Sequence, residues 1–357
     1  MEIKNHKKII EKNKYKKFKL LLIINNAKRK LGNIEVSAIG LGCMGFTHAY
    51  GEYPKEEESI KLVHFAFENG CNLFDTAEMY FCLKNEEFVG KALKGLPRDK
   101  IVISDKFWPT PLKGQEDIKE KLSEEGIRKC LEASLKRLQT NYIDIYILHA
   151  MDEPHLKEVA RVMGLLIKEG KIHAWGLSSP TAEQLKIAHN ITPVSVVQSE
   201  YSMMERKWEK DVIPLCKELG IGFEAFSPMG NGFLSGKFSS KDEFGKNDLR
   251  TVITRFKKEN LDANQPLLDL IGKYAKEKKC TNAQIALAWV LKGGDFIVPI
   301  PGMRKEERIK ENLGSINVKL TDEEYSSLNK ELEKIKIYGD RDSRDIAKLT
   351  TVPDNAH

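Results

Sequence analysis

Short apolar runs alternate with amphipathic stretches along the chain from about residue 38 onward. The apolar runs are rich in β-branched residues and contain few polar positions, which is typical of strands buried on both faces of a parallel sheet. Eight runs have this character, at residues 37–43, 71–74, 101–104, 143–148, 172–177, 194–198, 221–226 and 296–300. The segments between them have helical spacing, so the pattern predicts alternating strands and helices.

Helix boundaries are marked in several of the intervening segments. Residues 57–70 have apolar positions at helical spacing and end in a glycine, which is a C-cap signal. Thr181, Thr281 and Thr321 are each followed three residues later by Gln or Glu, the pattern of a capping box that opens a helix.

Eight strands with intervening helices predict an α/β protein with a (β/α)8 TIM barrel fold. A doubly wound parallel sheet is the alternative, because a strand count from one sequence is fallible. Residues 28–39 have the pattern of a β-hairpin turning at Gly32–Asn33, which could cap the barrel floor. We therefore expect a basic, poorly ordered N-terminal extension at 1–27, the barrel domain at 28–340 and a C-terminal tail at 341–357.

The net charge of +6 is carried by the N-terminal segment. Residues 1–30 hold 11 Lys or Arg and 2 acidic residues, whereas the rest of the chain holds 47 basic and 50 acidic residues. The barrel domain is therefore not expected to bind nucleic acid. For the extension itself we expect a solvated segment, with binding to an anionic surface or to nucleic acid as the alternative.

The lengths of the apolar runs and the spacing of the cysteines argue against a membrane protein, an exported protein and a zinc or dithiol protein. The longest apolar run near the start, at 18–24, is too short to span a membrane or to form a signal-peptide core. The six cysteines contain no C-x-x-C pair, so neither a metal site nor a redox dithiol is expected. We expect a cytoplasmic protein with reduced thiols and no membrane partner, and the sequence carries no signal for its oligomeric state.

The stretch GLGCMG at residues 40–45 fits the G-x-G-x-x-G pattern of a Rossmann loop. In that motif a helix begins at the third glycine, because the helix N-terminus binds the pyrophosphate. Here Gly45 is followed by loop-like sequence, and the next helix is expected only near Pro54. We therefore expect these glycines to let the backbone bend at the end of the first strand, and we expect any dinucleotide to bind elsewhere.

Four chemically active side chains follow consecutive predicted strands. Asp75 and Tyr80 come after the second strand, Lys106 after the third and His149 after the fourth. Each has an ordinary structural explanation, such as a helix N-cap for Asp75 or a hydrogen-bonded structural role for His149. At the C-terminal ends of barrel strands, however, all four would meet at the face that carries active sites.

These four side chains fit the reduction of a carbonyl group. The reaction needs a hydride, which must come from a cofactor, and a proton for the developing oxyanion. Tyr80 could give that proton, and a neighbouring Lys106 ammonium would lower the pKa of its phenol. Asp75 would hold Lys106 in place, and His149 could orient the carbonyl and stabilise its charge.

With these residues the sequence resembles the aldo-keto reductase superfamily over nearly all of residues 28–335. The resemblance rests on LGNIEVSAIGLGCMG, GCNLFDTAEMY, NEEFVGKAL, IVISDKF, YIDIYILH, GKIHAWGLSS, VQSEYS, FEAFSPMGNGFLSGKF and PIPGMRKEERIKENL, in that order. It implies an NADPH-dependent reductase of small aldehydes or ketones on a (β/α)8 barrel. The catalytic tetrad would be Asp75, Tyr80, Lys106 and His149, with Tyr80 as the proton donor.

The resemblance also implies cofactor positions. Ser178 and Gln198 would bind the nicotinamide carboxamide, and Phe226 would stack on the ring. The pyrophosphate would be covered by Ser227, Pro228, Met229, Gly230, Leu234 and Gly236. The adenosine end would contact Gly302, Arg304, Arg308, Glu311 and Asn312, where the two arginines suit a 2′-phosphate because guanidinium pairs bidentately with phosphate oxygens.

Two departures from the family pattern affect the expected function. Phe81 and Cys82 follow Tyr80 where the family usually has glycine next, which could reshape the substrate mouth. Met303 replaces a common Thr or Ser, so NADH stays an alternative to NADPH. The alternative function is a nucleotide-bound, redox-sensing module similar to potassium-channel β subunits.

Substrate specificity is expected from a set of apolar and aromatic side chains in the loops. These are Met44, Phe46, Phe81, Phe107, Trp108 and Met151, together with residues 229–263. Their character makes a hydrophobic or aromatic aldehyde a candidate substrate, and packing in the core is the competing explanation for each of them.

Overall fold

The computed structural model describes residues 27–81, 83–108 and 118–341. Of the expected N-terminal extension and C-terminal tail, only Ala27 and Arg341 are described, and Cys82 also lies outside the described residues. Within the described ranges, no helix is long and apolar enough to cross a membrane.

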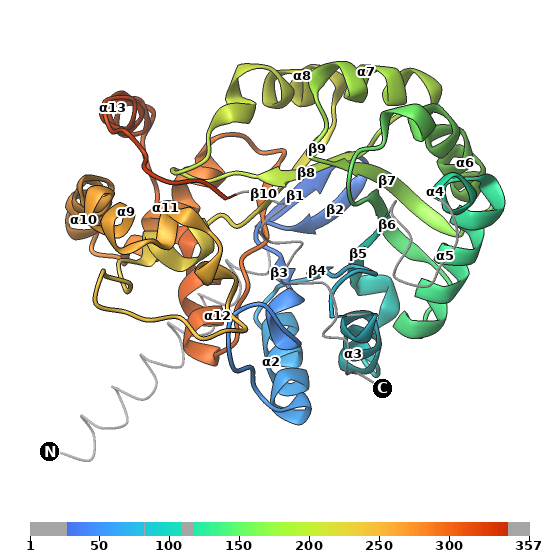
Figure 1. The fold of residues 1–357 in the computed structure, drawn as a ribbon, viewed down its shortest axis with the longest axis horizontal. Coiled ribbons are helices and arrows are strands. Elements are labelled where there is room, and N and C mark those ends of the chain that lie inside the picture. The colour runs from blue at the N-terminus through green and yellow to red at the C-terminus, as the bar shows by residue number, and fades with distance from the viewer. Residues whose placement is uncertain (1–26, 82, 109–117, 342–357) are drawn as a thin grey trace, which may run out of the picture.

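Eight parallel strands form one sheet in which each strand pairs with its neighbours in the sequence (Figure 1). They are β3 (Leu41–Gly42), β4 (Leu73–Asp75), β5 (Val102–Phe107), β6 (Ile143–Leu148), β7 (Ile172–Ser178), β8 (Val196–Glu200), β9 (Gly222–Phe226) and β10 (Ile297–Pro299). The two edge strands meet where Gly42 forms a parallel bridge with Gly302. The Gly40 amide also donates to the Pro299 carbonyl at 3.0 Å. The sheet therefore closes into the predicted barrel, and the doubly wound alternative is wrong.

Glycine is required where the barrel closes. A Cβ atom on Gly42 would lie 2.8 Å from the carbonyl oxygen of Ile300. One on Gly40 would lie 2.9 Å from the Ile300 side chain. Gly45 lies in a single 3-10 turn, η1 (Met44–Phe46), and the next α-helix begins at Glu56. The GLGCMG stretch therefore does not form a Rossmann loop, as expected, and its first two glycines serve barrel closure.

Helices surround the barrel on its outer side (Figure 1). The α-helices are α2 (Glu56–Glu68), α3 (Lys84–Leu93), α4 (Ile118–Lys121), α5 (Glu124–Leu138), α6 (Leu156–Lys168), α7 (Ala182–Ile191), α8 (Val212–Leu219), α9 (Lys258–Ala263), α10 (Gln265–Lys278), α11 (Asn282–Lys292), α12 (Glu306–Leu313) and α13 (Asp322–Leu332). Short 3-10 turns are η2 (Arg98–Lys100), η3 (Glu153–His155), η4 (Lys207–Lys210), η5 (Gly230–Ser235), η6 (Leu249–Thr251), η7 (Thr254–Phe256) and η8 (Gly314–Asn317). All three predicted capping boxes are confirmed at Thr181, Thr281 and Thr321.

The predicted hairpin is present and closes the barrel floor. β1 (Lys28–Leu31) pairs antiparallel with β2 (Ile34–Ser37). The first predicted strand, 37–43, is too long, because Ser37 belongs to the hairpin and only Leu41–Gly42 form β3. Leu31 is fully buried and packs with apolar side chains from the barrel interior. A Cβ on Gly222 would lie 2.4 Å from Leu31 Cα, which shows how closely the hairpin contacts the strand ends.

Candidate active site

The four predicted catalytic side chains come together at the C-terminal ends of the strands. Asp75 ends β4, Lys106 lies near the end of β5, and His149 directly follows β6. Lys106 Nζ donates to Asp75 Oδ2 at 2.5 Å and lies 4.9 Å from the centroid of the Tyr80 ring. The rings of Tyr80 and His149 meet edge to face at 5.6 Å. The strands thus bring together four residues that are up to 74 positions apart in the sequence.

The Lys106–Asp75 ion pair is buried at the base of this group. The two side chains are 0% and 4% exposed. Burial alone would lower the pKa of Lys106, but its interactions with Asp75 and then Tyr80 outweigh burial and raise the pKa above its usual value. Lys106 also donates to the Thr76 carbonyl at 2.6 Å. It is therefore held as a fixed cation next to the Tyr80 phenol.

Tyr80 is a weaker acid than the sequence analysis expected. Burial raises its pKa, Lys106 lowers it and Asp75 raises it again, and the result is about 12. The expected direction of the Lys106 effect is correct, but the cost of burying a phenolate is larger. Tyr80 therefore stays protonated at neutral pH, which is the state of a proton donor.

His149 is held neutral in this surrounding. Burial, followed by the positive charges of Lys106 and Arg341, lowers the pKa of its imidazole well below the usual value. Its Nδ1 atom has no hydrogen-bond partner among the described residues. Trp108 packs against the ring edge to face, at 4.9 Å between centroids. A neutral imidazole in this position can donate one N–H to a carbonyl oxygen.

A second set of polar side chains lies beside Asp75 inside the barrel. Asp75 is opposite Ser104 in the pairing of β4 with β5, and Gln198 is opposite Glu224 in the pairing of β8 with β9. Gln198 donates to Asp75 Oδ2 at 2.8 Å, and Ser104 donates to Glu224 at 3.0 Å. Burial, with the negative charge of Asp75, raises the pKa of Glu224 to about 8. The sequence analysis missed Glu224, because a single acidic residue in a strand gives no pattern.

A cavity of about 380 Å³ lies above the four catalytic candidates. It is lined by Tyr80 and His149, by the predicted cofactor residues Ser178, Gln198 and Phe226, and by Met44, His48, Met79, Trp108, Met151, Leu249 and Arg341. Three of the expected specificity residues, Met44, Trp108 and Met151, are therefore in place. Phe46 and Phe107 are not, because both are buried in the core, where they pack on Phe88 and Tyr146.

The backbone at Phe81 shows why glycine would suit this position. Its φ is 47°, in the left-handed region where glycine carries the least strain. The side chain is 39% exposed and stacks on His48 at 6.0 Å between ring centroids. Phe81 thus covers His48 at the rim, and His48 rather than Phe81 lines the cavity.

A second cavity, of about 390 Å³, adjoins the first and shares Gly45, Tyr50, Ser227 and Gly302 with it. Eight predicted cofactor residues line it: Ser227, Pro228, Met229, Gly302, Arg304, Arg308, Glu311 and Asn312. Three others do not. Leu234 is fully buried in the core, while Gly230 and Gly236 take φ of 54° and 70° and shape the turns around η5.

The second cavity is strongly basic, which fits a polyanionic dinucleotide. Its lining holds five basic residues, Lys237, Arg250, Arg304, Lys305 and Arg308, and one acidic residue, Glu311. Arg304 donates to the carbonyls of Tyr50 and Glu52 at 3.1 and 2.7 Å, and Arg308 pairs with Glu311. The cavity thus has the charge that nucleotide phosphates require.

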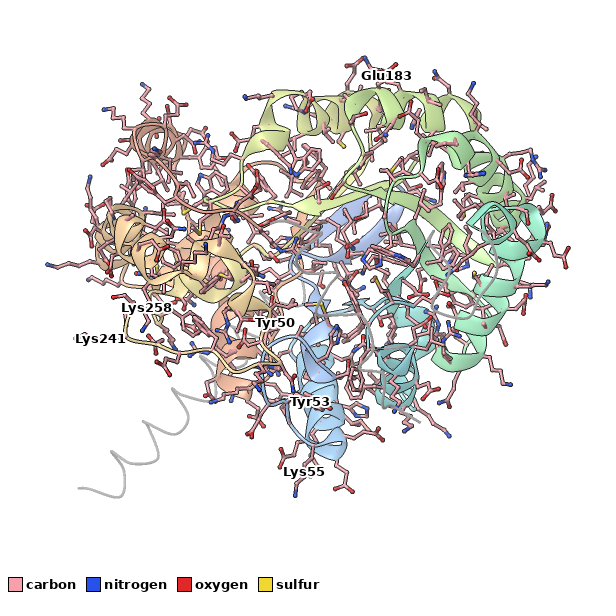
Figure 2. The ribbon with its side chains drawn as sticks, viewed as in Figure 1. Tyr50, Tyr53, Lys55, Glu183, Lys241 and Lys258 are labelled. Atoms are coloured by element: carbon pink, nitrogen blue, oxygen red, sulfur yellow. The ribbon has the colours of Figure 1, made fainter. Side chains whose placement is uncertain are left out.

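Arg250 and Tyr50 also line this cavity, and neither was predicted from the sequence. Tyr50 forms an antiparallel bridge with Asp248, so the loop after β3 meets the segment before η6 (Figure 2). Arg250 pairs with Asp248 and lies 4.4 Å from the centroid of the Phe238 ring. Neither residue has a sequence signal, because the contact joins two loops that lack regular spacing. Among the described residues, no group of three or more His, Cys, Asp or Glu could hold a metal ion.

Comparisons with known proteins agree with this geometry. Over 302 residues, the chain is 41% identical to a probable aldo-keto reductase 1 of Glycine max, covering 84% of this chain and 87% of that protein. A glycerol dehydrogenase structure from Gluconobacter oxydans matches with a TM-score of 0.77 and 28% identity, covering 87% of this chain and 96% of that one. An aldo-keto reductase structure from Klebsiella pneumoniae, in complex with NADPH, matches with a TM-score of 0.66 and 26% identity, covering 85% and 94%.

The family assignment rests on most of the chain. The model of the aldo/keto reductase family matches residues 38–333, from the start of the barrel wall to the end of its last helix. Together with the barrel and the four strand-end residues, this match shows that the chain belongs to the aldo/keto reductase family.

Proposed function

We propose that this family member reduces an aldehyde or ketone to the alcohol with NADPH, and that Tyr80 gives the proton. The observation that carries the proposal is the buried Lys106–Asp75 pair, which holds a fixed cation beside the protonated Tyr80 phenol. His149 completes the group with a neutral imidazole at the same cavity.

The four side chains can perform the proton transfer as a unit. When bound, NADPH supplies the hydride that adds to the carbonyl carbon. As the C–O π electrons move to oxygen, Tyr80 transfers its phenolic proton to that oxygen, and the alcohol forms. Lys106 stabilises the phenolate that remains, while His149 donates a hydrogen bond to the carbonyl oxygen. Tyr80 then regains a proton from water.

The basic cavity is the proposed site of the nucleotide. Ser178 and Gln198 would bind the carboxamide, and Phe226 would stack on the nicotinamide. Arg304 and Arg308 would meet the 2′-phosphate, and Glu311 and Asn312 the adenine. Support comes from the basic lining of this cavity, from its junction with the catalytic cavity, and from the Klebsiella neighbour that was solved with NADPH.

The test is NADPH consumption by the wild-type protein with a panel of aldehydes and ketones, with the alcohol counted by NMR. We expect one alcohol formed for each NADPH consumed. The panel should include neutral, aromatic and carboxylate-bearing carbonyl compounds, because the cavity is lined by apolar, polar and charged side chains. Tight NADPH binding without turnover of any of them would contradict the proposal and favour the redox-sensing alternative.

A further inference from the structure

The chain that follows α13 returns to the open end of the barrel and brings an arginine into the catalytic cavity. Figure 1 shows this red segment running from α13 back toward the strands. Arg341 lines the same cavity as Tyr80 and His149, and its guanidinium carbon lies 4.9 Å from the centroid of the Phe226 ring. The sequence analysis placed Arg341 in the C-terminal tail and gave it no role.

The position of this segment is fixed by specific contacts. The buried Asn264 side chain makes two hydrogen bonds of 2.9 Å with the backbone of Tyr338. The Asp340 amide donates to Thr254 Oγ1 at 2.7 Å. Gly339 has φ 79°, and a Cβ there would lie 2.6 Å from a backbone nitrogen of η7. The chain is thus built to pass closely over η7 and to deliver Arg341 to the cavity.

The Arg341 charge is only partly compensated in this position. Its side chain is 16% exposed, and its nearest carboxylate oxygen is that of Glu200, at 3.8 Å, which is longer than a hydrogen bond. Glu200 instead accepts a hydrogen bond of 2.8 Å from Arg255. The Nε atom of Arg341 is buried and has no partner among the described residues. A guanidinium that lines a cavity and makes no hydrogen bond to a carboxylate among the described residues is a binding group for an anion of matching shape.

Part of the remaining cavity wall suits the carbon skeleton of a substrate. Met44, Met79, Trp108 and Met151 are apolar or aromatic. Asp75 is the other charged residue in the described lining, and its carboxylate is already paired with Lys106. The cavity therefore combines apolar wall segments and a reaction centre with an arginine whose nearest carboxylate, that of Glu200, is 3.8 Å away.

We propose that Arg341 selects carbonyl substrates that carry a carboxylate, by binding the carboxylate while the carbonyl group faces Tyr80. This inference rests on the proposed carbonyl reduction and names its substrate class. It replaces the expected hydrophobic aldehyde with a molecule that has an apolar body and an anionic end. The competing source of an anion is the nucleotide phosphate, which the experiment must separate from the substrate.

The first test measures binding without turnover. Benzoate and the isosteric neutral benzamide are titrated into the NADP⁺-loaded protein, and the change in tryptophan fluorescence, to which Trp108 in the cavity contributes, is the signal. We expect wild type to bind benzoate about tenfold or more tightly than benzamide, as for one charged hydrogen-bonded contact. Arg341→Met should remove this preference and Arg341→Lys should keep part of it. Arg161→Met, which removes an exposed arginine paired with Glu124 and Glu158, should keep all of it.

The second test measures turnover of 4-carboxybenzaldehyde and of its methyl ester. For Arg341→Met we expect a loss of about tenfold or more in kcat/KM on the acid, mainly through KM, and little change on the ester. If wild type prefers benzoate but turns over neither aldehyde, the proposed reduction is contradicted and the proposed anion site is still supported. Equal affinity of wild type for benzoate and benzamide would overturn the inference. The inference would also be overturned if Arg341→Met weakened NADP⁺ binding and lost kcat/KM equally on both aldehydes. That result would show that Arg341 binds the cofactor. If Arg341→Met does not fold, wild type and Arg341→Lys decide the question.

Discussion

At the scale of single residues, the protein buries two opposite charges that depend on each other. Lys106 and Asp75 satisfy each other inside the barrel, so removing one partner leaves the other buried and unpaired. We expect Lys106→Met to lower the free energy of unfolding by about 3–5 kcal/mol, as for other broken buried pairs. Urea unfolding measures this change.

The matched control is the double variant Lys106→Met/Asp75→Leu. It removes both charges, so it should recover much of the lost stability while carbonyl reduction stays absent. A single variant as stable as wild type would contradict the importance of the pair for folding. Recovery of turnover in the double variant would contradict its importance for chemistry.

Glu224 gives a prediction about pH. Burial raises its pKa from the usual 4.5 to about 8, so the folded protein keeps this proton over an interval in which the unfolded chain loses it. Glu224 therefore lowers stability progressively as the pH rises from 4.5 to about 8. Glu224→Gln removes this titration, so its stability relative to wild type should rise across the interval and be constant below it.

Chemical unfolding of both proteins at a series of pH values measures this difference. The control is Glu132→Gln, whose carboxylate is 60% exposed on α5 and pairs with Lys171. Its stability curve should run parallel to that of wild type. A Glu224→Gln curve that also runs parallel would show that Glu224 is ionised in the folded protein throughout.

At the scale of elements, the closure between β3 and β10 depends on small residues. A Cβ on Gly42 would lie 2.8 Å from the Ile300 carbonyl oxygen, and backbone cannot move away cheaply. We expect Gly42→Ala to cost about 1–3 kcal/mol of unfolding free energy, the range for overpacked sites. Gly245→Ala, where a Cβ meets nothing within 4 Å, should change it by less than about 0.5 kcal/mol. Equal effects of the two substitutions on the urea midpoint would contradict the role of Gly42.

Strand boundaries were predictable where the apolar run begins and ends at the same residues as the strand. The run 143–148 coincides with β6, because all six of its residues are buried. The run 101–104 ends too early, since β5 continues to Phe107 through the charged Asp105 and Lys106. Both side chains are fully buried, and burial raises the pKa of the Asp105 carboxyl well above its usual value. Buried polar residues near the end of a strand thus interrupt the apolar run, so the predicted strand ends too early.

At the scale of the whole molecule, the site combines parts that differ in how well the sequence shows them. Asp75, Lys106 and His149 were predictable because each lies at the end of a recognisable strand. Arg341 and Arg250 were not predictable, because they line the cavities from loops whose positions depend on contacts with other loops. Tertiary contacts such as those of Asn264 with Tyr338 set their positions, and no local spacing encodes such contacts.

Whether Tyr80 gives the proton is decided by the single-turnover rate of NADPH consumption in Tyr80→Phe. The substitution removes the phenolic proton and keeps the ring. The control is Tyr142→Phe, since the Tyr142 hydroxyl contacts only the Arg98 carbonyl, at 3.5 Å, among the described residues. With a carbonyl compound that wild type reduces, we expect Tyr80→Phe to lose about 10²–10⁴-fold in rate at unchanged NADPH affinity, as for a positioned acid. The control should lose little. Equal rates for wild type and Tyr80→Phe would contradict the role of Tyr80 as the proton donor.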